Sequence, residues 1–208
     1  MEPHLLPLFP LQLVLFPRTL LPLHIFEDRY KALIGDVLQE KIEFGVVLAG
    51  EKGICSMGCT AIIEKVTERY PDGRMDLVTL GRRRFEITSL DDEKSYLRAS
   101  VEFFDDDDFE VVPAEIDARV RENYEALSAV GSGSFEPRMQ DPQLSFQLAQ
   151  IVPDVNFRQM LLSLRSEAGR MKELAEFLPS YVTRQREIQH VKSVAPKNGH
   201  GKWPSSAE

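Results

Sequence analysis

Cys55 and Cys59 are the residues whose types and spacing could bind a metal ion or form a redox pair. A structural zinc site needs about four cysteine or histidine ligands, and the chain has no second cysteine pair and only four histidines. The nearest histidine in sequence, His24, lies among apolar residues in LPLHIF. We therefore predict no metal site, no redox pair and two buried or half-buried thiols. Two cysteines also argue against a secreted disulfide scaffold and favour a reducing cytoplasm.

Two glycine-flanked segments come close to the phosphate-binding pattern G-x-x-x-x-G-K-[ST], in which backbone amides and a lysine hold the phosphates. Residues 45–50 are followed by Glu51, an acid where the lysine must be, and residues 53–58 are followed by Cys59. We therefore predict no nucleotide site. No motif indicates a serine–lysine pair, in which lysine activates a hydroxyl. The sequence thus predicts no catalytic, cofactor-binding or metal-binding residues.

The charge distribution disfavours nucleic acid and anionic membranes as partners. The formal net charge is −8 and the sequence pI is about 5.2, whereas a phosphate backbone is bound through clustered lysine and arginine. The basic cluster Arg82-Arg83-Arg84 opens a predicted strand, so its side chains should alternate between faces, and no aromatic stacking series accompanies it. Between Glu102 and Asp117 there are eight acids and no base. We interpret this run as a solvated connector.

His24 and the residues that follow it mark the entrance to a helix. A single histidine beside Phe26 is interpreted as a satisfied packing residue. Acidic side chains such as Glu27 and Asp28 interact favourably with the dipole of a first helical turn. Arg29 is expected to pair with a carboxylate.

The segment from Leu5 to Tyr30 is strongly apolar but contains four prolines, and Pro3 precedes it. Each internal proline removes a backbone donor and clashes with the preceding turn, so this segment cannot be a membrane-spanning helix of roughly 20 residues. It lacks the preceding positive charge and the cleavage site of a signal peptide. We predict short buried strands joined at prolines. Its predicted core residues are Leu5, Phe9, Phe16 and Phe26.

The sequence pattern up to about Phe104 predicts mainly strands and one amphipathic helix. The apolar stripe of this helix begins at Tyr30 and ends at Leu38. Turn signals such as Pro71-Asp72-Gly73 separate alternating runs, which predict a small barrel or curled sheet. The predicted strand regions are residues 43–48, 59–67, 75–80, 84–90 and 97–104.

The second half reads as helical. A helix over residues 114–130 precedes the flexible linker Gly131–Ser134. A second helix should end near Pro153, and Asp154 is a plausible N-cap for a third. A longer helix opens at Ser166 and contains Pro179, which should kink it or lie near a break. The polar stretch from Ala195 predicts a disordered tail.

The opening LPLFPLQLVLFPRTLLPLHIFEDRY closely resembles the start of the LON N-terminal domain, the substrate-binding domain of ATP-dependent Lon protease, and of standalone bacterial LON-domain proteins. Glu27 and Arg29 occupy characteristic positions of that motif. The resemblance covers about residues 3–192. Further matching segments follow in order: GVVL at 45–48, GCTAII at 58–63, DGRMDLVTLGRRRFEI at 72–87, YLRASVEFFDDD from Tyr96, and RQMLLSLRSEAGRMKELAEFL at 158–178.

The resemblance implies an α+β fold with two lobes. Residues 3–104 would form a PUA-like β-barrel lobe with one helix, residues 105–113 an acidic connector, and residues 114–192 an α-helical bundle lobe. Residues 193–208 would be a disordered tail.

The resemblance also implies a non-catalytic module that binds unfolded or extended protein segments and lacks the ATPase and peptidase parts. We expect it not to be an enzyme, to use no cofactor, and to act in the cytoplasm without nucleic acid or membrane partners. Three alternatives stay open: an adaptor or regulator of a protease or other assembly, a hydrolase, and an RNA-binding PUA-like module. The binding residues and the oligomeric state are left unassigned.

Overall fold

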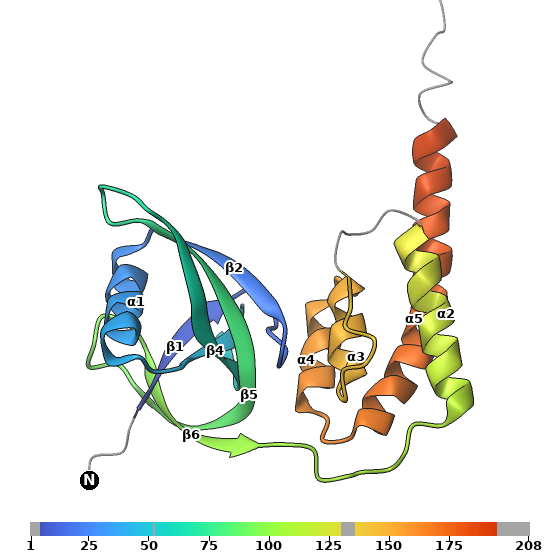
Figure 1. Cartoon of the computed structure of the whole chain (residues 1–208), viewed down its shortest axis with the longest axis horizontal. Coiled ribbons are helices and arrows are strands. Elements are labelled where there is room, and N and C mark those ends of the chain that lie inside the picture. The colour runs from blue at the N-terminus through green and yellow to red at the C-terminus, as the bar shows by residue number, and fades with distance from the viewer. Residues whose placement is uncertain (1–4, 52, 130–135, 195–208) are drawn as a thin grey trace, which may run out of the picture.

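A computed structural model describes residues 5–51, 53–129 and 136–194 (Figure 1). Within them the fold is mixed α+β, as predicted, with six strands followed by a helical half. The strands and the first helix are β1 (Leu6–Leu11), β2 (Leu20–Ile25), α1 (Asp28–Glu40), β3 (Phe44–Gly50), β4 (Gly53–Arg69), β5 (Met75–Asp91) and β6 (Arg98–Phe104). The helical half contains α2 (Ala114–Ala129), α3 (Leu144–Leu148), the 3₁₀ turn η1 (Ala149–Ile151), α4 (Val155–Ser163) and α5 (Glu167–Val194).

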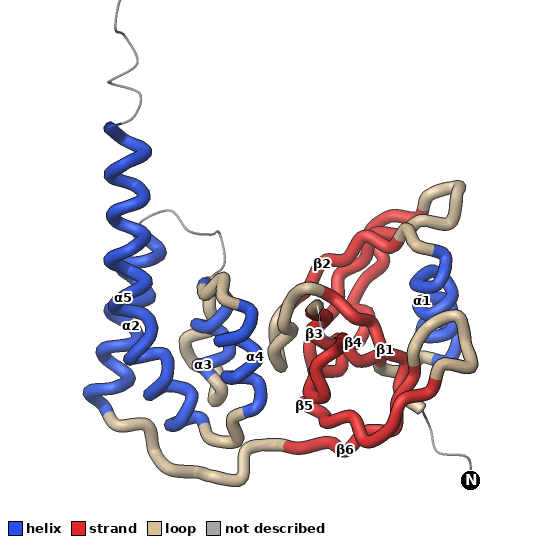
Figure 2. The backbone as a smooth tube through the Cα atoms, turned by 180° about the vertical axis from the view of Figure 1, so that it is seen from behind, coloured by secondary structure: helices blue, strands red, loops and turns tan. Residues whose placement is uncertain are grey.

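The six strands form one sheet in the order β2-β5-β4-β3-β1-β6, and an additional β5–β6 pairing joins the sheet to itself. β5 is long enough, at 17 residues, to pair with β2 along its first half and with β6 along its second. The two strand regions predicted at 75–80 and 84–90 are therefore one strand. β2 pairs only with β5 and so lies outside the closed part of the sheet, as Figure 2 shows.

The predicted helix α1 covers one end of the sheet with the apolar stripe read from the sequence. Tyr30, Leu33, Ile34 and Val37 are buried on it. The rings of Phe9 on β1 and Tyr30 on α1 stack with their centroids 4.1 Å apart. The helix ends at Lys41, whose φ of 56° turns the chain into β3.

The loop between β1 and β2, residues 12–19, lies against β5 at Gly81. The Gly81 amide donates to the Thr19 carbonyl, and the Arg18 amide donates back to the Gly81 carbonyl. A Cβ atom at residue 81 would lie 2.1 Å from the carbonyl oxygen of Phe16, so only glycine permits this approach.

The sheet and the helices lie side by side in Figure 1, and buried residues from both contribute to one continuous core. Phe16 from the β1–β2 loop stacks on Phe146 of α3 with ring centroids 5.0 Å apart. Asp154 caps α4 as predicted, because its side chain accepts hydrogen bonds from the amides of Asn156 and Phe157. α5 packs along α2, contains Pro179, and continues to Val194, so residues 193 and 194 of the predicted tail are helical.

The acidic segment at residues 105–108 is not simply a solvated connector, because Asp106 is the half-buried counter-ion of two buried arginines. Its carboxylate accepts from Arg84 of β5 at 2.6 Å and from both terminal nitrogens of Arg170 of α5 at 2.7 and 2.6 Å. The two arginine side chains are only 1% and 0% exposed. Burial alone would raise the pKa of Asp106, but the hydrogen bonds and charges of Arg170 and Arg84 lower it to about 2. This cluster joins the sheet to the helices.

Two predicted segments, the linker Gly131–Ser134 and the tail from Ala195 onward, lie outside the described residues.

Candidate functional site

A cavity of about 400 Å³ opens between β1 and β2, and we call it the β1–β2 slot. β1 pairs with β3 along residues 8–11, and its pairing with β6 is limited to residues 6 and 7. Within the described chain, the edges of β1 and β2 that border the slot therefore have no strand partner. The slot is lined by Phe9, Pro10, Leu11, Gln12, Leu23, His24, Phe26, Glu27, Arg29, Tyr30 and Ala49.

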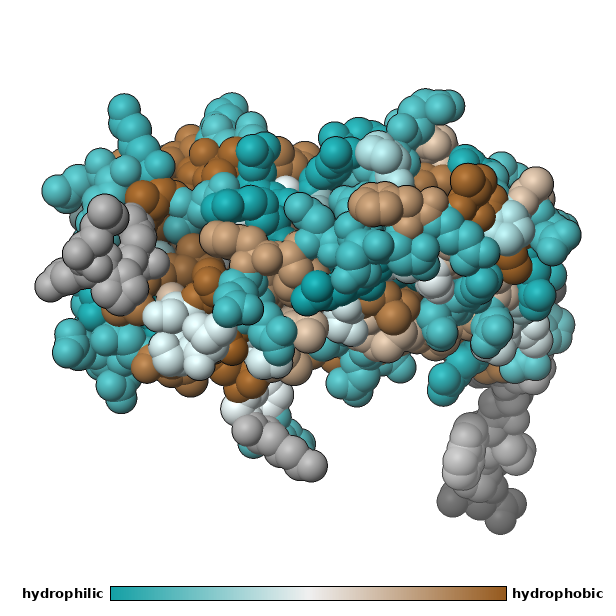
Figure 3. Space-filling model, turned by 90° about the horizontal axis from the view of Figure 1, so that it is seen from below, coloured by the Kyte–Doolittle hydropathy of each residue, from teal (hydrophilic) through white to brown (hydrophobic). Residues whose placement is uncertain are grey.

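Two large apolar side chains on or next to β2 are exposed, and one of them, Phe26, lines the slot. Leu20 on β2 is 59% exposed and Phe26, directly after β2, is 58% exposed. The prediction that Phe26 belongs to the core is thus wrong, whereas Phe9 and Phe16 are buried as predicted. Phe26 follows an edge strand, so no neighbouring strand covers it. On the face drawn in Figure 3, apolar surface appears as separate patches between polar side chains.

His24 is not an enclosed packing residue, because it lies exposed at the slot and holds a carboxylate. Its Nδ1 atom lies 2.5 Å from Oδ1 of Asp76, and the Tyr70 hydroxyl donates to Oδ2 of the same carboxylate at 2.7 Å. The hydrogen bonds from His24 and Tyr70 lower the pKa of Asp76. The described lining contains no serine, threonine, cysteine or lysine. The described lining therefore lacks the side chains that most often act as acyl-transfer nucleophiles.

Glu27 and Arg29 form the ion pair that the sequence predicts. The guanidinium of Arg29 lies 2.8 Å from the Glu27 carboxylate and 4.5 Å above the centre of the Tyr30 ring. Both contacts hold the Arg29 side chain across one end of the slot.

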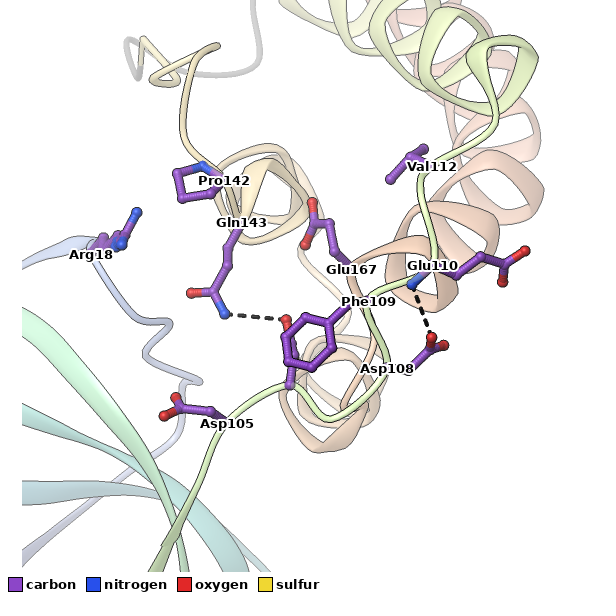
Figure 4. Close-up of a pocket in the computed structure, with 10 residues that line it drawn as sticks. Arg18, Asp105, Asp108, Phe109, Glu110, Val112, Pro142, Gln143 and Glu167 are labelled. Atoms are coloured by element: carbon purple, nitrogen blue, oxygen red, sulfur yellow. Dashed lines mark hydrogen bonds between the residues drawn. The ribbon is translucent and has the colours of Figure 1, made fainter.

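A second cavity, of about 520 Å³, lies where the acidic segment meets the helices (Figure 4). Asp106 and Glu167 at this cavity are engaged by Arg170, and Arg18 is engaged by Asp141. Phe109, whose ring is drawn at the front of Figure 4, is 83% exposed. The charged groups here mainly hold the two halves of the molecule together.

The other residues considered from the sequence show no converging site. Cys55 is half-buried and Cys59 is buried, and both thiols are free. Burial raises the pKa of Cys59 to about 12, so this thiol is not a reactive thiolate near neutral pH. No group of three or more metal-ligating side chains occurs in the part of the chain that the structure describes. A search of the same residues found no helix long and apolar enough to span a membrane.

The three arginines at residues 82–84 lie in different environments. Arg84 is buried in the Asp106 cluster, whereas Arg82 is exposed. Arg83 pairs with Glu43 at 3.2 Å and lies 3.8 Å from the centre of the Phe103 ring. The three guanidiniums therefore do not form one basic patch, as predicted. The division is not a simple alternation, because Arg82 and Arg83 are both exposed and the β4–β5 register shifts between residues 81 and 84.

Sequence reasoning did not identify the slot. Its walls come from β1, β2 and the start of α1, and the apolar opening segment was interpreted as core throughout. The prolines were a signal of its position. Pro10 and Pro22 lie in strands with an unpaired edge, where the missing amide donor is tolerated.

Comparison with protein families gives one match over most of the chain. A family model described as the ATP-dependent protease La (LON) substrate-binding domain matches residues 5–193.

Curated relatives include the Lon protease of Anaeromyxobacter dehalogenans, 29% identical over 205 residues that cover 89% of this chain and 24% of the relative. The Lon protease of Parabacteroides distasonis is 31% identical over 110 residues, which cover 49% of this chain and 13% of the relative. The chain thus spans a quarter or less of the curated relatives it matches.

Solved structures are also similar. A Lon N-terminal domain protein from Xanthomonas campestris aligns with a TM-score of 0.68 and 25% identity, covering 84% of this chain and 98% of that one. The N-terminal domain of a Mycobacterium avium complex Lon protease aligns with a TM-score of 0.59 over 85% of this chain and 98% of that one; at 16% identity it supports the fold alone.

Proposed function

The chain belongs to the family of LON substrate-binding domains, and from this premise we propose that it binds extended segments of other proteins in the β1–β2 slot. The family match over residues 5–193 supports a substrate-recognition role. Because the chain spans so little of the Lon proteases, their ATP hydrolysis and peptide cleavage are not assigned to it. We propose a binding module without catalytic activity of its own.

The observation that carries this proposal is the pair of unpartnered strand edges on either side of an apolar cavity. An extended segment entering the slot could pair its backbone with β1 or β2, as in β-strand addition. Pro10 and Pro22 lack amide donors, so the edges offer fewer main-chain hydrogen bonds than ordinary strands. We infer that burial of client side chains supplies most of the affinity, at about 1.5–3 kcal/mol for a large apolar side chain.

We further infer that the closed sheet is the PUA-like β-barrel lobe of this family and that the helices form a second lobe. Residues 3–104 and 114–192 would be these lobes, with 105–113 between them. The cytoplasm is the proposed compartment, consistent with the bacterial relatives and the free thiols.

The proposal is tested by fluorescence anisotropy with labelled segments of an unfolded model protein. Phe26→Ser should weaken binding roughly tenfold, the effect of losing about 1.4 kcal/mol of apolar burial. Leu20→Ser should weaken it less, because Leu20 lies at the start of β2 and does not line the slot.

Two controls make the test specific. Leu90→Ser removes an apolar side chain that is 54% exposed, close to the 59% of Leu20, and that does not line the slot. Phe109→Ser removes the exposed ring at the other cavity. Both variants should bind as the parent protein does. No binding at high micromolar concentration would refute a generic client-binding role, and loss of binding only in Phe109→Ser would move the site to the acidic segment.

A second candidate function is docking to one folded partner, as an adaptor would do. Phe109 and Val111 favour it, because they are 83% and 84% exposed within an acidic segment. Affinity capture from a lysate distinguishes the two functions. One stoichiometric partner that is lost in a Phe109→Ser, Val111→Ser double variant supports the adaptor, and a broad set of clients lost in Phe26→Ser supports the slot.

A further inference from the structure

The β1–β2 slot does not end at Arg29. A neighbouring cavity of about 340 Å³ lies beyond it, and Pro10, Arg29 and Tyr30 line both cavities. The loop between β5 and β6 contributes the remaining wall of this second cavity, with Asp92, Lys94, Ser95, Tyr96 and Leu97. We call the two adjoining cavities together the groove. Its β2 end is the more apolar, with Leu11, Leu23 and Phe26, and its end at the β5–β6 loop is the more polar.

The cations in this groove are already matched by carboxylates. Arg29 pairs with Glu27 at 2.8 Å, and Lys94 pairs with Asp36 at 2.7 Å. The hydrogen bonds from Lys94 to Asp36 and Tyr96 raise the pKa of Lys94 to about 12. Neither cation is therefore available to an incoming carboxylate without breaking an existing pair.

Asp92 is the unmatched charge of the groove. The acids on either side of it, Asp91 and Glu93, both pair with Arg98. Asp92 is exposed, lines the second cavity, and makes no ion pair with any residue that the structure describes. With the other two ion pairs neutral, the groove has an excess negative charge at this end, in a chain of net charge −8.

Building on the proposed function, we propose that the groove selects client segments in which an apolar side chain is closely followed or preceded by a lysine or arginine. The apolar side chain occupies the β1–β2 slot beside Phe26 and Leu23. The cationic side chain passes Arg29 and pairs with the Asp92 carboxylate in the second cavity. The occupant is thus an extended basic–apolar protein segment.

Three fluorescein-labelled peptides of one extended sequence test this inference by anisotropy at low ionic strength. Each has one central phenylalanine, and the position two residues away, which lies on the same face of an extended segment, is lysine, glutamine or glutamate. The lysine peptide should bind the parent protein about two- to fivefold more tightly than the glutamine peptide, as expected for an exposed ion pair. The glutamate peptide should bind most weakly. The differences should shrink at 1 M salt, where the screening length is about 3 Å.

Asp92→Asn should remove the preference for lysine and leave binding of the glutamine peptide unchanged. Glu64→Gln is the matched control, because Glu64 is an exposed acid on β4 that lines neither cavity, and it should keep the preference. Equal binding of the three peptides by the parent protein would overturn the charge selection while leaving the proposed function intact. If the Asp92→Asn variant bound none of the three peptides, that result would also overturn the charge selection. Failure of every peptide to bind the parent protein would overturn the proposed function itself.

Discussion

Replacing Asp106 by asparagine is expected to lower the free energy of unfolding by about 3–5 kcal/mol, the usual cost of removing one partner of a buried ion pair. Asp106 accepts three hydrogen bonds from Arg84 and Arg170, and a fourth at 3.3 Å from Gln143. Asparagine keeps a single acceptor oxygen and turns an NH₂ group toward guanidinium donors. Arg84 would then lose its carboxylate partner, and Arg170 would keep only Glu167.

The pKa of Asp106 gives a second estimate of how much this carboxylate contributes to the free energy of unfolding. A fall from the model-compound value of 3.8 to about 2 corresponds to roughly 2 kcal/mol, at about 1.4 kcal/mol per pKa unit. This smaller figure counts only the preference for the ionised carboxylate, whereas the variant also leaves donors unpaired. The folded-state pKa is depressed, so this stabilisation is present above pH 3.8 and is lost as the pH falls toward 2.

Urea unfolding followed by circular dichroism measures both effects. The parent protein should lose stability between pH 4 and pH 2, and Asp106→Asn should show a smaller loss over that window. Asp107→Asn is the adjacent control, because Asp107 is 65% exposed and forms an exposed ion pair with Arg165 at 3.4 Å. This substitution should lower the free energy of unfolding by less than about 1 kcal/mol. A cost for Asp106→Asn no larger than that of the control would refute the idea that this carboxylate holds the two halves together.

Two further predictions concern backbone packing and thiol reactivity. Gly81→Ala should destabilise the fold by about 1–3 kcal/mol, because its Cβ would meet the Phe16 carbonyl at 2.1 Å. Gly35→Ala on helix α1 should stabilise the fold by about 0.5–1 kcal/mol, because the added Cβ would meet nothing within 4 Å. Urea midpoints of the two variants that fail to move in opposite directions would contradict this. With its pKa at about 12, Cys59 should react with a thiol reagent only in denaturant. Thiol titration of the native protein should therefore detect at most Cys55. Rapid labelling of both thiols in the native protein would be inconsistent with the burial of Cys59.

Features determined by neighbouring residues could be predicted from the sequence. The stripe from Tyr30 predicted α1, and Asp154 predicted the start of α4, because a helix face and a cap depend on residues within a few positions. The pairing of Glu27 with Arg29 is local in the same way. The strand assignment also predicted that the guanidiniums at positions 82–84 would not form one patch, although their burial does not follow a simple alternation.

Features determined by distant residues could not be predicted. Four identical aspartates give no sign that Asp106 alone meets Arg84 and Arg170, which lie 22 and 64 residues away. Phe26 follows an apolar strand, and its exposure depends on β2 having only one neighbour in the sheet. The slot required the same long-range information, because its walls come from two strands that do not pair with each other.

The position of the β1–β2 loop has a consequence for binding. This loop, residues 12–19, connects the two walls of the slot and is held from the helical half at its backbone carbonyls. Arg158 donates to the Val14 carbonyl at 2.7 Å, and Gln147 and Arg138 donate to the Arg18 carbonyl. The walls of the slot are thus held in place by residues of the helical half, which do not line the slot. Binding would then cost the conformational entropy of the incoming segment but little conformational entropy of the protein.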